Sequence, residues 1–259
     1  MTNFKQYLNL YWRSTWKIQL LIVLLMYFLL AVNYCIGYID DIVSYHTIHF
    51  VPEDNTVNVM VNNIGLGLCA FIACASAMFG TMSSKEGRLA NLCLPVGVRA
   101  KYVTYFLTSI VFPIVAFYVC AFLADWTRMA IVSVAAGPEL AVATPVSYML
   151  TFSGADDWHI AVVVPILLLM AQAFFAAGSI FFPGKSFLKT LGLSAGLCVA
   201  AGFLVCFSIQ IFFPDEISIN LIDFDVYFWS LVLAALAVTV ALHVVSYYRL
   251  KESEVQNRW

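Results

Sequence analysis

Six long apolar runs limit what this chain can fold into more than any other feature. Each is long enough to cross about 30 Å of hydrocarbon, which takes roughly 20 helical residues. The runs lie near residues 18–38, 59–82, 102–124, 160–182, 190–213 and 226–248. A backbone in lipid must satisfy its own hydrogen bonds, and the runs lack the alternation of a barrel strand. The sequence therefore predicts an all-α polytopic membrane protein with six transmembrane helices.

The composition leaves no room for a large water-soluble domain. Hydrophobic residues make up 63% of the chain and charged residues 11%, whereas soluble domains are about 45–50% apolar and about 25% charged. The seven cysteines are scattered, odd in number and without a C-x-x-C pair, so no disulfide framework is expected. We therefore treat residues 1–259 as a single transmembrane domain.

The basic residues predict which side of the membrane each loop faces. All but one of the 13 lysines and arginines lie in the two terminal segments and in the loops after the second and fourth runs; Arg128 is the exception. Most acidic residues lie in the other loops. Loops rich in Lys and Arg stay in the cytoplasm, so both termini are predicted to be cytoplasmic.

The N-terminal segment, residues 1–17, has aromatic and apolar residues at helical spacing. This pattern predicts an amphipathic helix that lies along the inner leaflet and leads into the first span. The alternative is a simple interfacial anchor of that span, and the sequence barely separates the two.

The connection after the second run carries more signals than a passive loop. Ser83 and Glu86 have the spacing of a capping box, and Pro95 disfavours further helix. An apolar stripe at helical spacing is formed by Leu89, Leu92, Cys93 and Val96. These signals predict a short cytoplasmic helix over 83–97 with one apolar face. On physical grounds alone it either lies on the lipid or docks onto a partner.

The segment from Glu86 to Lys101, EGRLANLCLPVGVRAK, resembles a segment of the permease subunits of ABC-2-type transporters. Gly97 stands where members of that family often carry Ser. The predicted architecture is also similar to that of the family: an N-terminal amphipathic helix, six spans, and a helix between the second and third. The resemblance implies that 83–97 is a coupling helix, which docks into a cleft of a separate ATPase. It implies ATPase-coupling roles for Glu86, Arg88, Leu89, Leu92, Pro95 and Val96.

The resemblance also implies a function and partners. The chain would be the permease subunit of an ATP-driven exporter in the inner membrane of a prokaryote, surrounded by lipid and binding no nucleic acid. It would pair as a homodimer, or as a heterodimer with a second permease, and would not itself be an enzyme. Two other classes stay open: an ATP-independent carrier or channel for small solutes, and a non-transporting scaffold or immunity protein. A carrier would more often show repeated spans, and residues 1–124 and 125–259 show no convincing similarity.

Uncharged polar residues inside the runs are candidates for a transport pathway. They are Asn33, Asn62, Asn63, Gln172 and Gln210. Hydrogen bonds between packed helices are the alternative explanation. Spans without charge suit a hydrophobic or amphipathic cargo, although a small ion is not excluded. Asp125 and Arg128, three residues apart at the outer end of the third run, are expected to pair.

Other patterns in the sequence predict no further chemistry. The segment Gly184-Lys185-Ser186 lacks the upstream glycine of a phosphate loop, because that position is Ser179. Histidines and aspartates on the predicted outer face are scattered over two loops, so no metal site is expected, and neither catalytic nor cofactor-binding residues are predicted.

Two segments allow more than one structure. Gly192 and Gly196 have the spacing of a close helix contact, which would suit a dimer seam but also arises by chance. The weakly polar segment 129–158 is expected to form a surface helix or a re-entrant hairpin.

Overall fold

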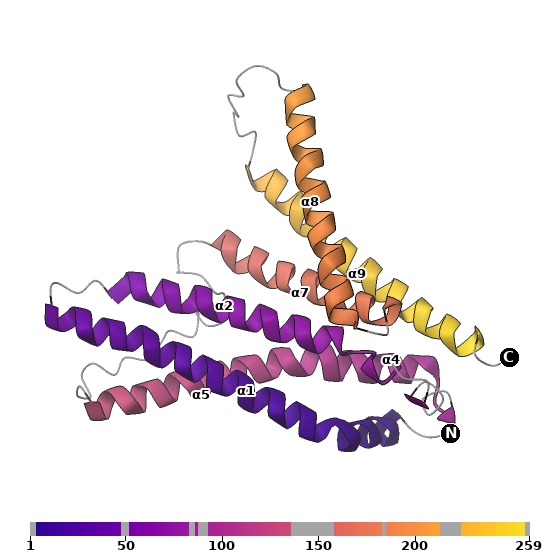
Figure 1. Cartoon of the computed structure of the whole chain (residues 1–259), viewed down its shortest axis with the longest axis horizontal. Coiled ribbons are helices and arrows are strands. Elements are labelled where there is room, and N and C mark those ends of the chain that lie inside the picture. The colour runs from indigo at the N-terminus through magenta and orange to yellow at the C-terminus, as the bar shows by residue number, and fades with distance from the viewer. Residues whose placement is uncertain are drawn as a thin grey trace.

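A computed structural model shows the chain as an assembly of helices (Figure 1). It describes residues 4–47, 52–82, 86–87, 93–135, 158–182, 185–212 and 224–256. The elements in order are α1 (Phe4–Thr47), α2 (Pro52–Ser76), the short 3-10 helix η1 (Gly80–Met82), α4 (Val98–Phe106), the π-helix η2 (Leu107–Val111), α5 (Phe112–Ala135), α7 (Trp158–Phe181), α8 (Ser186–Phe212) and α9 (Phe224–Gln256).

Several of these helices are long and apolar enough to cross a membrane, which agrees with a helical multi-pass membrane protein. The described residues contain 5 such spans, Phe4–Gly37, Asn62–Met82, Val98–Val134, Val162–Phe181 and Phe228–Ser253. The predicted span 190–213 falls on α8. Helix α8 has 27 residues, and the apolar stretch identified in its fully described part is Ser186–Ala200, so a sixth crossing stays a prediction.

The first helix is longer than either segment predicted for it. The sequence divided this region into residues 1–17 and 18–38, but α1 runs unbroken from Phe4 to Thr47. No proline interrupts it, and Gly37 is its only glycine. A Cβ at Gly37 would collide with Val59 of α2, so the glycine permits a close approach of the two helices.

The third span is also longer than predicted. Instead of 102–124, α4, η2 and α5 together carry a span over Val98–Val134, which is 37 residues. At 1.5 Å per residue this is about 55 Å, well beyond the roughly 30 Å of a hydrocarbon core. Residues 129–135 of the predicted loop are therefore helical, and the rest of that loop, 136–157, lies outside the described residues.

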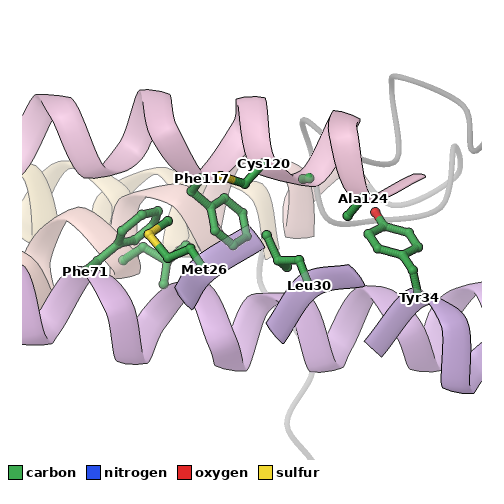
Figure 2. Close-up of a cluster of buried hydrophobic side chains, with 9 residues drawn as sticks. Met26, Leu30, Tyr34, Phe71, Phe117, Cys120 and Ala124 are labelled. Atoms are coloured by element: carbon green, nitrogen blue, oxygen red, sulfur yellow. The ribbon is translucent and has the colours of Figure 1, made fainter. Parts of the chain in front are cut away.

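The helices pack into two neighbouring groups. In one, α1 packs along α5 and α2; in the other, α7 packs along α9, and α2 lies between the groups because it also contacts α7. Figure 1 shows α1, α2 and α5 running side by side, with the two chain termini and the start of α4 at the same end. Buried side chains of α1, α2 and α5 form one hydrophobic core, which includes Met26, Leu30, Phe71 and Phe117 (Figure 2).

In the part of the chain that the structure describes, the contacts of α8 lie at its base. Ser186 donates a hydrogen bond of 2.8 Å to the backbone oxygen of Ser76, and Thr190 is fully buried against Gly178 of α7. Beyond that base α8 leans away from α1, α2, α5 and α7 (Figure 1). A Cβ at Gly192 or Gly196 would meet no other atom, so the close approach that their spacing allows is not made within the described part of this chain.

Candidate functional site

The connection between α2 and α4 was the main site predicted from the sequence. Of the six predicted coupling residues, Glu86 and Pro95 are exposed and Val96 is half-buried. Arg88, Leu89 and Leu92 lie outside the described residues, so the apolar stripe of the predicted coupling helix stays a prediction. Glu86, Gly87 and Cys93 are helical. The connection lies at the end of the molecule that also holds both termini (Figure 1).

A cavity of about 370 Å³ separates this connection from the N-terminal part of α1. Its walls include Tyr7, Tyr11, Thr81, Gly87, Leu94 and Tyr105. The connection therefore packs against α1 and α4 around this hollow.

Aromatic side chains of α1, α4 and α9 meet Phe79, in the turn that follows α2, beneath the connection. We call this set the inner aromatic cluster, after the side predicted to face the cytoplasm; it comprises Tyr11, Phe79, Tyr102, Tyr105, His243 and Tyr247. Tyr105 makes edge-on ring contacts with Tyr11 and Phe79, at centroid distances of 5.3 Å and 5.4 Å. Tyr102 packs edge-on against Tyr247 at 5.6 Å, and its hydroxyl donates a 3.0 Å hydrogen bond to the backbone oxygen of His243. A displacement of α4 would thus act directly on α1, on the turn that follows α2, and on α9.

The π-helix η2 interrupts the third span just above this cluster. Pro113 has no N–H, so the carbonyl of Thr108, its partner in an i, i+5 pattern, lacks a backbone donor from that position. Nε2 of Gln19 lies 3.5 Å from this oxygen. Nε2 of Gln172 donates to the backbone oxygen of Ile110 at 3.4 Å. Side chains from α1 and α7 thus donate to backbone oxygens of the π-helix, and Gln19 reaches the one that Pro113 leaves without a backbone donor.

The predicted pathway residue Gln172 therefore has a defined role, since it is fully buried and binds the backbone of η2. Sequence reasoning missed Gln19. A proline inside an apolar run was the available signal, because the carbonyl it frees requires a donor from a neighbouring helix.

A second polar group lies toward the other end of α1, α2 and α5. Asn33 Nδ2 donates hydrogen bonds to Asn63 Oδ1 at 2.8 Å and to the backbone oxygen of Val59 at 3.2 Å. The buried Tyr34 has a side-chain hydrogen bond with Asn63. We use the name outer polar cluster, after the side predicted to face away from the cytoplasm, for Asn33, Tyr34, Asn63, Asp125 and Arg128.

The charged members of the outer polar cluster form the predicted ion pair. Arg128 Nε and Nη2 each lie 2.8 Å from Asp125 Oδ1, and the side chains of Asp125 and Arg128 are only 3% and 11% exposed. The expected pairing is confirmed. Buried charges inside a membrane protein are costly unless they are paired. The paired charges of Asp125 and Arg128 also act on the nearby Tyr34 side chain.

Of the other four predicted pathway residues, the structure brings two together. Asn33 and Asn63 bond to each other, whereas Asn62 is exposed on α2. Gln210 lies in α8, and its side chain is outside the part of the chain that can be described. Sequence reasoning missed Tyr34, although its spacing from Met26 and Leu30 continues their buried stripe on α1.

The described residues contain no group of three or more His, Cys, Asp or Glu side chains that could hold a metal ion. Comparisons with models of protein families, with curated proteins and with solved structures gave no match. The fold therefore defines the chain as a helical multi-pass membrane protein, and its function must be argued from its own residues.

Proposed function

We propose that the chain is the membrane-spanning permease subunit of an ATP-driven ABC exporter. It has no nucleotide site of its own and couples to a separate ATPase through the cytoplasmic helix at 83–97. The observation that carries the proposal is the segment from Glu86 to Lys101, with its resemblance to ABC-2-type permeases.

The packing around this segment supports a role in transmitting movement. The connection continues through Pro95 and Val96 into α4, which begins at Val98. Tyr102 and Tyr105 of α4 belong to the inner aromatic cluster, so a movement of the connection would reach α1, the turn that follows α2, and α9 through packed rings. Packed elements of this kind shift between discrete arrangements rather than bending continuously.

In this proposal one chain supplies half of the membrane unit. A second copy, or a second permease, supplies the other half, and two ATPase subunits bind on the cytoplasmic side. The transport path would form between the two halves.

Co-purification tests the proposal. The tagged chain is purified in mild detergent as wild type and as the double variant Leu89→Asp/Leu92→Asp, which places two charges on the predicted docking stripe. The matched control is Ala90→Asp/Asn91→Asp, which puts the same two acids on the same connection, off the stripe. We expect an ATP-binding subunit with wild type and with the control, and its loss from the stripe variant.

Absence of any ATP-binding subunit in all three preparations, repeated after cross-linking in intact membranes, would contradict the proposal. Equal loss from both double variants would show that added charge, rather than the stripe, breaks the contact.

A further inference from the structure

An apolar cavity of about 320 Å³ lies between α1 and α2. Its walls include Met26, Leu29 and Leu30 of α1, Leu66 and Cys69 of α2, and Phe117 of α5. Figure 2 shows Met26, Leu30 and Phe117 converging between the helices. Ligand sites in proteins range upward from about 300 Å³, so the cavity is large enough for one small apolar group or chain.

The cavity itself is lined by apolar side chains, and amides of α1 and α2 follow about one helical turn beyond its end at Leu30 and Leu66. Asn33 lies four residues beyond Leu29 and seven beyond Met26, on the same face of α1. Asn62 and Asn63 precede Leu66 on α2 by four and three residues. The 2.8 Å hydrogen bond between Asn33 and Asn63 bridges the two helices, and the contact of Gly37 with Val59 closes them further out.

The amides at this end leave some hydrogen-bonding capacity unused. Asn33 uses its Nδ2 for Asn63 and Val59, which leaves its Oδ1 as an acceptor. Asn62 is exposed and has no hydrogen-bond partner among the residues that the structure describes. The charges nearby, Asp125 and Arg128, already bind each other. This end of the cavity therefore suits a hydroxyl-bearing group without charge.

We propose that the α1–α2 cavity binds an uncharged amphiphile. One hydrocarbon chain occupies the space between Met26, Leu66 and Phe117, and a hydroxylated head group bonds to Asn33 and Asn62. The α1 wall from Ile22 to Leu30 rises about 12 Å, which sets the length of chain enclosed. Only the further step, that this amphiphile is the exported cargo, rests on the proposed function.

Photolabelling of the purified full chain in phosphatidylcholine vesicles tests the site. The probe is a monoacylglycerol with a diazirine in its acyl chain, and labelled residues are mapped by mass spectrometry. We expect labels on the cavity walls of α1 and α2. Ala73→Phe, at the cavity, should lower them about tenfold, because the ring displaces several methylene groups of the probe. Ala195→Phe, on the exposed surface of α8, makes the same change away from the cavity and should leave them unaltered.

A second variant tests the head group without filling the cavity. Asn62→Leu removes an exposed amide and should lower labelling by the monoacylglycerol about fivefold. Labelling by a diazirine alkane, which has no head group, should not change.

Two results would overturn the inference. The first is labelling spread evenly over all exposed apolar faces, α8 included, which would show bulk lipid contact only. The second is equal labelling by both probes with no response to Asn62→Leu. Labelling by both probes is measured on the isolated chain. The result therefore does not depend on whether an ATPase co-purifies.

Discussion

At the scale of single residues, the Asp125–Arg128 pair shows how the third long helical segment carries two charges. Two charges in a long apolar helix suggest an end at the membrane surface, which is where the sequence placed it. The two side chains instead neutralise each other at 2.8 Å, and the helix continues to Ala135. The predicted end of the span at residue 124 lies inside the continuous helix α5, whose local ion pair lets the helix carry both charges inside the protein.

Removing one partner of this pair should be strongly destabilising. Asp125→Ala leaves the Arg128 guanidinium, 11% exposed, without its carboxylate. We expect a loss of about 3 kcal/mol in the free energy of unfolding, measured by denaturant titration in detergent micelles.

The double variant Asp125→Ala/Arg128→Met is the control, since it removes both charges. It should recover most of the lost stability. A double variant as unstable as the single one would mean that the pair contributes through other contacts.

The base of α8 offers a second residue-scale test. A Cβ at Gly178 would collide with the side chain of Thr190, which is fully buried. Gly178→Ala should therefore destabilise the chain by about 1–3 kcal/mol in the same titration, because α8 must move away from α7. Gly192→Ala on α8 has open space and should cost nothing measurable. Equal effects of the two alanines would contradict the close α7–α8 contact.

At the scale of elements, the π-helix η2 separates α4, which leads from the connection, from α5. Pro113→Ala restores an N–H and favours a regular α-helix through this stretch. We expect less movement between α4 and α5, seen as a narrower distance distribution between spin labels at Val103→Cys and Val119→Cys, two exposed positions on these helices. Native cysteines are replaced in this background.

The matched control is Pro165→Ala, which removes a proline from inside α7. Pro165→Ala should not change the distribution of distances between the spin labels on α4 and α5. An unchanged distribution in Pro113→Ala would show that η2 is a rigid irregularity and not a hinge.

The positions of the long apolar helices could be predicted from the sequence, but the hydrogen bonds between these helices could not. Hydropathy alone located the helices because lipid allows few alternatives to a helix. The partners of Gln19 and Gln172 depend on which helices pack beside η2, and hydropathy carries no information on that. The bond between Asn33 and Asn63 was equally out of reach, since it needs the pairing of α1 with α2, 30 residues apart in sequence.

At the scale of the whole molecule, the account predicts which end faces the cytoplasm. Cys93 is exposed on the connection, and Val134 is 89% exposed near the opposite end of the third span. In single-cysteine chains, a membrane-impermeant maleimide should label Cys93 only from the cytoplasmic side and Val134→Cys only from the outside. The reverse pattern would invert the orientation inferred from the basic residues.

The central claim is that the connection at 83–97 docks onto a separate ATPase, and in-membrane cross-linking tests it most directly. A photoreactive amino acid is placed at Leu92, on the predicted stripe, or at Ala90, off the stripe, in the otherwise intact chain. The account predicts a cross-link to an ATP-binding subunit from Leu92 and little or none from Ala90. Cross-links to lipid alone from both positions would contradict the claim and would make the connection an interfacial helix.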